Sequence, residues 1–127
     1  MRRHFSPESL APPFGRYHHG VSVDAPGRLL VLSGQLGIRP DGSVPEDAGE
    51  QTRLILAAIE ACLDEAGMTR ADLVRLTTYI TEPEARLPYM AARDAWVADP
   101  PPASTLVIVK ALALPACKVE IEATAAR

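Results

Sequence analysis

The chain has 127 residues, with 13 Lys or Arg against 16 Asp or Glu, which gives a formal net charge of −3. This length suits one domain with a single core. A mildly acidic chain without a basic run argues against a nucleic-acid-binding surface. The start is basic but lacks a following apolar stretch, and no run is long enough to cross a bilayer. We therefore expect neither a signal peptide nor a membrane anchor.

The first third of the chain predicts an arm followed by two strands. Residues 1–14 contain three prolines and little periodicity, which favours an N-terminal arm. Loose alternation over 17–23, a turn, and an apolar run over 29–33 predict two strands that pair as a hairpin. Gly34 directly after the second strand permits a bulge or a close approach of the backbone to a ligand.

The middle of the chain predicts two helices separated by a strand. Asp47 with Glu50 three residues later is typical of a helix start, and Gly67 suits the position just after a helix. The segment Leu73–Ile80 alternates and is β-branched, which predicts a strand. A second helix is expected over 85–97.

Two apolar runs near the end of the sequence, 105–109 and 119–123, predict two more strands. Alternation places Glu120 and Glu122 on one face of the second strand. A carboxylate in such a place either forms a surface ion pair or belongs to a cleft, and the pattern leaves both alternatives open.

The apolar runs 29–32 and 106–109 lack polar alternation, which is typical of strands covered on both faces. The two predicted helices can cover one face of a sheet. The economical cover for the other face is a second copy of the chain, so we expect a homo-oligomer.

The cysteines and histidines do not predict a metal site. Cys62 and Cys117 lie far apart and lack the C-x-x-C spacing of zinc and redox sites. Isolated cysteines are typical of free thiols in a reducing compartment, which predicts a cytoplasmic protein. His18 and His19 are adjacent, so in a strand they would point to opposite faces and could not readily ligate one metal.

Six short motifs, in their order and spacing, resemble the RidA family, also called the YjgF or endoribonuclease L-PSP family. The resemblance runs from about Gly15 to Ala126. The motifs are Gly15-x-Tyr17, Val31-Leu32-Ser33-Gly34-Gln35, Gln51-Thr52, the Leu73–Ile80 strand, Pro102-Ala103-Ser104-Thr105 and Val119-Glu120-Ile121-Glu122-Ala123.

The resemblance implies a chorismate-mutase-like α+β fold, with a mixed six-stranded sheet and two helices on one face. It also implies a homotrimer with the sheets inward and small-molecule clefts between neighbouring subunits. Founding members hydrolyse reactive 2-imino and enamino acids to 2-oxo acids and ammonia without a cofactor. The implied partner is therefore a small metabolite, with neither nucleic acid nor membrane.

The resemblance also implies residue roles. Tyr17 and Glu120 would be the catalytic residues, with Tyr17 lining the cleft. Glu120 would position the attacking water, a task that suits a carboxylate in a partly dry cleft. Ser33 and Gly34 would offer hydroxyl and backbone contacts to the substrate.

One substrate-binding position departs from the family pattern. The founding members carry an arginine there, which binds the substrate carboxylate through two hydrogen bonds. This chain has Ser104 instead, and Leu106 where cysteine is common. The Ser104 hydroxyl cannot replace a guanidinium, which is charged and donates two hydrogen bonds. We therefore expect weak turnover of 2-imino acids, and a gain of activity in Ser104→Arg. The cations that could substitute are Arg16, His19, Arg93 and Lys110.

Three functions stay open at this point. The first is a cofactor-free imine or enamine deaminase with altered substrate choice, and the second is a non-catalytic trimer that binds a metabolite or regulates a partner. The third, a ribonuclease or translation inhibitor, is disfavoured by the net charge of −3 and the low aromatic content.

Overall fold

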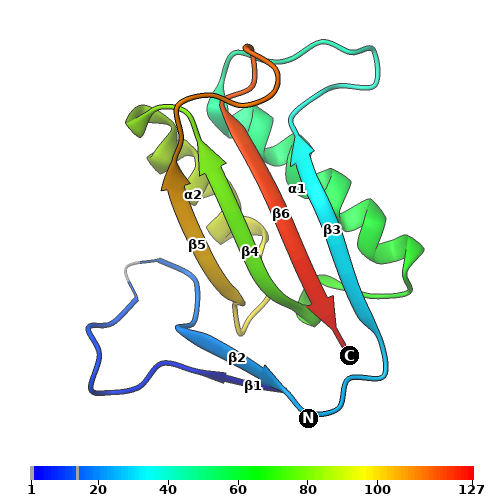
Figure 1. Ribbon diagram of the computed structural model, residues 1–127, viewed down its shortest axis with the longest axis vertical. Coiled ribbons are helices and arrows are strands. Elements are labelled where there is room, and N and C mark those ends of the chain that lie inside the picture. Colours follow the sequence, from blue (N-terminus) through cyan, green and yellow to red (C-terminus); the bar gives the residue numbers. More distant parts are fainter. Residues whose placement is uncertain (1, 14) are drawn as a thin grey trace.

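The computed structural model describes residues 2–13 and 15–127, and its main element is a four-stranded sheet backed by two helices (Figure 1). β6 pairs antiparallel with β3 and β4, whereas β4 and β5 are parallel. An α+β fold with a mixed sheet and two helices on one face is thus confirmed. In spatial order the strands are β3 (Leu29–Leu36), β6 (Val119–Ala126), β4 (Leu73–Ile80) and β5 (Ala103–Ile108).

The helices begin and end close to the positions that the sequence predicts. Before α1 (Ala48–Glu65), Oδ2 of Asp47 accepts a hydrogen bond from the backbone N of Glu50 at 2.9 Å. Gly67 follows the helix with a φ of +67°, a conformation that glycine adopts without strain. α2 (Arg86–Trp96) follows a short 3-10 turn. Neither helix among the described residues is long and apolar enough to cross a membrane.

The core lies between these helices and the inner face of the sheet. Every second residue of β6 points into it, and the apolar stripe of α1 packs against them. The fully buried large side chains include Ile55, Leu56, Ile59 and Leu63 from α1, Leu76 and Ile80 from β4, Tyr89 from α2, and Val119 and Ile121 from β6.

The strand pairing at the N-terminal end differs from the prediction. β1 (Arg2–Phe5), within the expected arm, pairs antiparallel with β2 (Gly20–Val23) as a separate two-stranded sheet. The predicted hairpin is therefore wrong, and the strands divide into sheets of four and two instead of one sheet of six. β3 pairs with β6 because this arrangement brings Leu30 and Leu32 against the common core.

Residues 17–19 precede β2 instead of extending it as predicted, although His18 forms a parallel bridge with Ala103 at the start of β5. The backbone N of His18 also donates to the carbonyl of Pro102 at 2.9 Å. This contact brings the Tyr17 segment to the edge of the main sheet. Residues 1 and 14 of the predicted arm lie outside the described residues.

The sheet face away from the helices is open in the protomer, and Figure 1 shows it toward the viewer. Leu29 and Val31 lie on it, 64% and 69% exposed, whereas Leu30 and Leu32 point inward. The expectation that both faces of β3 are covered is thus not met within one protomer. A second copy of the chain as the missing cover stays a prediction.

Gln51 joins α1 to two loops. It is fully buried, and its Nε2 donates to the carbonyls of Pro45 and Ala116 at 2.8 and 3.0 Å. Its Oε1 accepts from the backbone N of Lys118 at 2.8 Å. The Gln51-Thr52 motif therefore has a structural role, because it fixes the entries to α1 and β6.

Gln51→Ala should lower the free energy of unfolding by about 2–4 kcal/mol, since it leaves a cavity and three buried or partly buried backbone groups without this partner. Urea unfolding followed by circular dichroism measures this. Gln35→Ala is the matched control, because among the described residues the Gln35 side chain donates one hydrogen bond, to the carbonyl of Ser33 at 2.9 Å. Equal effects of the two substitutions would contradict the structural role of Gln51.

Candidate functional site

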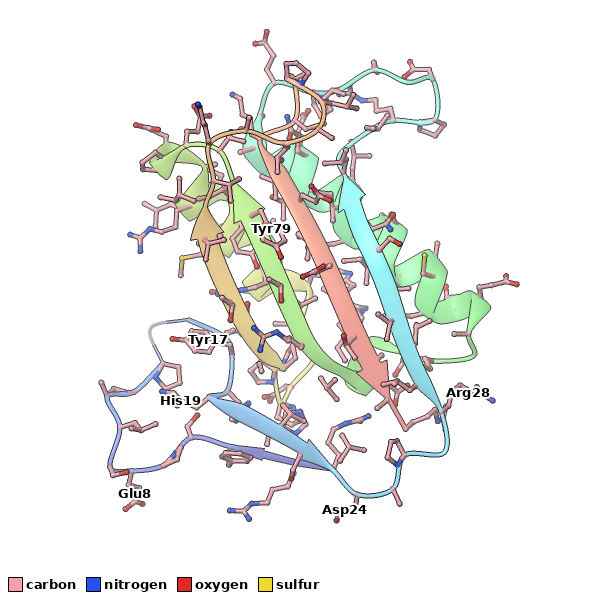
Figure 2. All side chains as sticks on the ribbon, in the orientation of Figure 1. Glu8, Tyr17, His19, Asp24, Arg28 and Tyr79 are labelled. Carbon is pink, nitrogen blue, oxygen red and sulfur yellow. The ribbon has the colours of Figure 1, made fainter. Side chains whose placement is uncertain are left out.

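A cavity of about 200 Å³ lies between α2 and the edge strand β5. Ser104 and Leu106 reach it from β5, and Tyr17 lines it from the N-terminal segment, as Figure 2 places that residue. We call it the arginine cavity. Its lining residues are Tyr17, Arg86, Met90, Arg93, Ser104 and Leu106.

Arg93 is 3% exposed, and its guanidinium is held from several sides. Nε donates to Oδ1 of Asp94 at 2.9 Å, and Nη1 donates to Oγ of Ser104 at 3.3 Å. The guanidinium carbon lies 5.9 Å from the ring centre of Tyr17 and 5.4 Å from that of Tyr89, within cation–π range. A guanidinium therefore stands beside Ser104, although it comes from a helix instead of from the strand.

The second terminal nitrogen of Arg93, Nη2, is incompletely satisfied. It lies 2.9 Å from Oδ1 of Asp94, which makes an ion pair, yet no acceptor in the described part of the chain is aligned with its N–H groups. Nη2 can be close to this oxygen and still lack a hydrogen bond, because the N–H of Nε is the group that points at Oδ1 of Asp94. A Cβ added at Gly15 would lie 2.7 Å from Nη2, so a side chain there would displace the guanidinium.

A second group of predicted site residues lies on the open face, where β6 runs beside β3. The Glu120 carboxylate packs on Gly34, because a Cβ added there would overlap Oε1 and lie 2.9 Å from Cδ of Glu120. Exposed Ser33 lies at the same bulge, where the register between β3 and β6 shifts. We call Ser33, Gly34 and Glu120 the carboxylate site. Gly34 leaves the room that the carboxylate occupies.

The two glutamates of β6 differ in their partners. Glu122 accepts a hydrogen bond from Oη of Tyr79 at 2.9 Å, which raises the pKa of the tyrosine. Within residues 2–13 and 15–127, the Glu120 carboxylate has no hydrogen bond or ion pair. Nearby, burial and then the charge of Glu120 raise the pKa of the Cys117 thiol, so this thiol is neutral at pH 7. Glu120 is therefore the carboxylate that is free to act on a water molecule.

The arginine cavity and the carboxylate site lie on opposite faces of the sheet. Ser104 and Leu106 pair in register with Leu76 and Thr78, which are fully buried on the helix side. Glu120 lies between two fully buried residues of β6, so its side chain points to the open face. One protomer thus does not bring the predicted site residues into a single cleft.

The other candidate cations lie elsewhere. Arg16 donates to the carbonyl of Ala98 at 3.3 Å, and Lys110 is exposed after β5. His19 is exposed, with its ring 6.4 Å from that of Tyr17. The Nδ1 atom of His18 lies 2.7 Å from the carbonyl of Pro101. In the described part of the chain, no three His, Cys, Asp or Glu side chains gather to hold a metal ion.

Sequence reasoning missed Arg86 and Met90 as cavity residues, and it left Arg93 as one cation among four. A signal was present, because residues 86, 90 and 93 have the i, i+4, i+7 spacing of one helix face. The spacing did not indicate which element this helix face packs against, which is the edge strand β5.

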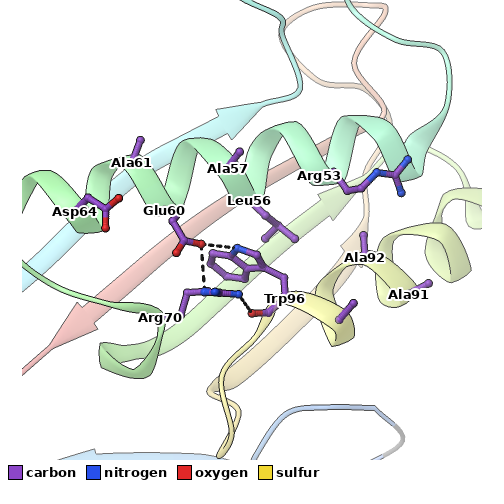
Figure 3. Close-up of a pocket in the computed structure, with 11 residues that line it drawn as sticks. Arg53, Leu56, Ala57, Glu60, Ala61, Asp64, Arg70, Ala91, Ala92 and Trp96 are labelled. Atoms are coloured by element: carbon purple, nitrogen blue, oxygen red, sulfur yellow. Dashed lines mark hydrogen bonds and ion pairs between the residues drawn. The ribbon is translucent and has the colours of Figure 1, made fainter.

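A larger hollow, about 700 Å³, lies elsewhere, on the surface between α1 and α2 (Figure 3). Three of its residues bond one another: Glu60 accepts from Nε1 of Trp96 at 2.8 Å and pairs with Arg70 at 3.2 Å. Arg70 also donates to the carbonyl of Trp96. Alanines line much of the remainder, together with Arg53 and exposed Asp64, and no residue that the sequence predicts for the site is among its described lining residues.

Comparisons with known proteins agree with this fold. A solved Rid-family protein of unknown function, YyfB from Yersinia pestis, is 36% identical, with a TM-score of 0.87 over 99% of this chain and 98% of that one. A 2-iminobutanoate/2-iminopropanoate deaminase of Escherichia coli is 29% identical over 100% of this chain and 99% of its own. A RutC family protein of Aquifex aeolicus is 39% identical over 55% of this chain, but the match spans only about half of that relative, 54%. The family model for endoribonuclease L-PSP matches residues 8–127, so the chain belongs to this family, the RidA or YjgF family.

Proposed function

We propose that the protein is a cofactor-free deaminase that hydrolyses small 2-imino or enamino acids. In this proposal three copies assemble, and the arginine cavity of one subunit meets the carboxylate site of its neighbour. Water adds to the C=N carbon, the resulting carbinolamine collapses, and the products are a 2-oxo acid and ammonia. Glu120 takes a proton from the attacking water and returns it to the departing nitrogen.

The observation that carries the proposal is the division of the site into two incomplete halves. The arginine cavity offers a cation, a hydroxyl and apolar walls for binding, but no free carboxylate to activate water. The carboxylate site offers Glu120, which has no hydrogen bond or ion pair among the described residues, on the open sheet face. Arg75 of β4 lies on the same face, but its guanidinium donates to the hydroxyls of Thr77 and Thr105. Each half supplies what the other lacks. Full-length similarity to the deaminase of Escherichia coli supports the same reaction class.

The direct test generates 2-iminopropanoate in situ from serine with a dehydratase and follows the decay of the imine. The purified protein, dialysed against a chelator, should shorten the lifetime of the imine in proportion to its concentration. Both products, pyruvate and ammonia, should appear in equal amounts. An imine lifetime that does not depend on the protein would contradict the proposal. If 2-oxobutanoate nevertheless bound, the chain would be a metabolite-binding protein instead.

A further inference from the structure

We propose that Arg93 supplies, from α2, the anion-binding guanidinium that the family resemblance leads one to expect at position 104 of β5. The arginine cavity would then hold the carboxylate of a small 2-oxo or 2-imino acid against Arg93 and Ser104. This inference deepens the proposed function and relies on it for the identity of the reaction. The binding step itself can be measured without any turnover.

The contacts of Arg93 leave part of its fork available to a ligand. Asp94 engages Nε and lies beside Nη2 on one edge, which fixes the plane of the guanidinium. Nη1 points to the hydroxyl of Ser104, and Nη2 retains N–H groups without an aligned acceptor in the described part of the chain. A ligand carboxylate in the cavity would accept charge-assisted hydrogen bonds from these N–H groups.

The surroundings of Arg93 differ from those of an ordinary surface arginine, which extends its charged group into water. This guanidinium is instead enclosed by the rings of Tyr17 and Tyr89 and by the backbone at Gly15. Among the described residues, Asp94 is the one carboxylate within ion-pair distance of it. A buried donor that stays unsatisfied costs free energy, which an anionic ligand would recover on binding.

The cavity also limits the ligand. Its volume of about 200 Å³ equals the share of roughly six or seven water molecules, enough for an acid of a few carbon atoms. Leu106 and Met90 provide apolar wall beyond the guanidinium. The preferred ligand is therefore a small 2-oxo or 2-imino acid with a short apolar side chain.

This geometry changes the outcome expected for Ser104→Arg. Nη1 of Arg93 already lies 3.3 Å from the Ser104 hydroxyl, so a second guanidinium would meet the first at close range. Two cations that share one cavity repel each other. Ser104→Arg alone should therefore weaken carboxylate binding, and it should restore binding only where Arg93 has been removed.

The experiment measures binding by isothermal titration calorimetry, with 2-oxobutanoate as the probe and its neutral amide as the matched ligand. Arg93→Gln should weaken 2-oxobutanoate binding about ten- to a hundredfold and leave the amide within about threefold. The affinity of Arg93→Lys for 2-oxobutanoate should lie between those of the wild type and Arg93→Gln, because an ammonium group keeps the charge but lacks the planar guanidinium. Arg53→Gln on α1, at a residue that lines a different hollow, removes the same charge and should leave both affinities unchanged.

The decisive variant is Arg93→Gln/Ser104→Arg, which moves the guanidinium from the helix to the strand. It should recover most of the lost 2-oxobutanoate affinity, a result that a merely structural role of Arg93 does not produce. If Arg93→Gln fails to fold, Ser104→Glu keeps Arg93 and gives it a carboxylate of the chain itself. That variant should abolish 2-oxobutanoate binding, whereas Ser104→Gln should retain part of it.

The results separate the two proposals. Binding that depends on Arg93 without hydrolysis would overturn the proposed function and uphold the role of Arg93. Hydrolysis with 2-oxobutanoate affinity unaffected by Arg93→Gln would overturn the role of Arg93 alone. Equal losses for the acid and its amide in Arg93→Gln would also overturn it, since they would indicate a general collapse of the cavity.

Discussion

Glu120→Gln should lower kcat for 2-iminopropanoate hydrolysis by about two to four orders of magnitude, the usual contribution of a general base. The amide has nearly the same shape as the carboxylate, but it is a poor proton acceptor at neutral pH. Because the Glu120 carboxylate has no hydrogen bond or ion pair within the described residues, the change should leave the melting temperature within a few degrees. Initial rates and thermal unfolding of both proteins measure the two effects.

Glu122→Gln is the matched control, two residues along the same strand face. Its carboxylate accepts the Tyr79 hydroxyl, and a side-chain amide oxygen can accept the same hydrogen bond. We expect the rate to change by less than about tenfold. A loss in Glu122→Gln as large as in Glu120→Gln would show that the wrong glutamate has been assigned.

Mixing variant subunits tests whether the two halves of the site come from different copies. In a cyclic trimer, a mixed assembly of Glu120→Gln and Arg93→Gln subunits contains one interface with an intact Glu120 and an intact Arg93. Random mixing of equal amounts should therefore restore about a quarter of the wild-type sites, although each variant alone has little activity at substrate concentrations well below KM. No restoration after denaturation and joint refolding would contradict a site shared between two copies.

Val31→Lys should convert the assembly to monomers and remove the activity with it. Val31 is 69% exposed at the open sheet face, where we expect another copy of the chain to pack. Burying a lysine there without a partner costs several kcal/mol at each interface. Light scattering coupled to size-exclusion chromatography should show the mass fall from about three times 13.6 kDa to one.

Leu87→Lys provides the control for this experiment. Leu87 is 67% exposed, almost the same as Val31, but it lies on α2, on the other side of the sheet. The substitution should leave both the mass and the rate unchanged. A wild-type protein that is already a folded monomer at micromolar concentration would contradict the expected assembly and the shared cleft together.

The sequence by itself determined the local elements of this protein. The ends of α1 follow from the side chain of Asp47 and from the left-handed backbone at Gly67, because caps depend on residues a few positions apart. Strand alternation likewise determined that Glu120 and Glu122 share the face opposite the core. These features are short-range, so the order of residues is enough to predict them.

Only the tertiary structure decided which elements meet. The hairpin expected from neighbouring strands is replaced by long-range pairing of β3 with β6, because burial of both apolar patterns in one core outweighs proximity in sequence. Position 104 lacks an arginine in the sequence, yet Arg93 reaches the same place from α2. Sequence order could not reveal this, because the contact depends on how a helix face lies against an edge strand and on the direction of one long side chain.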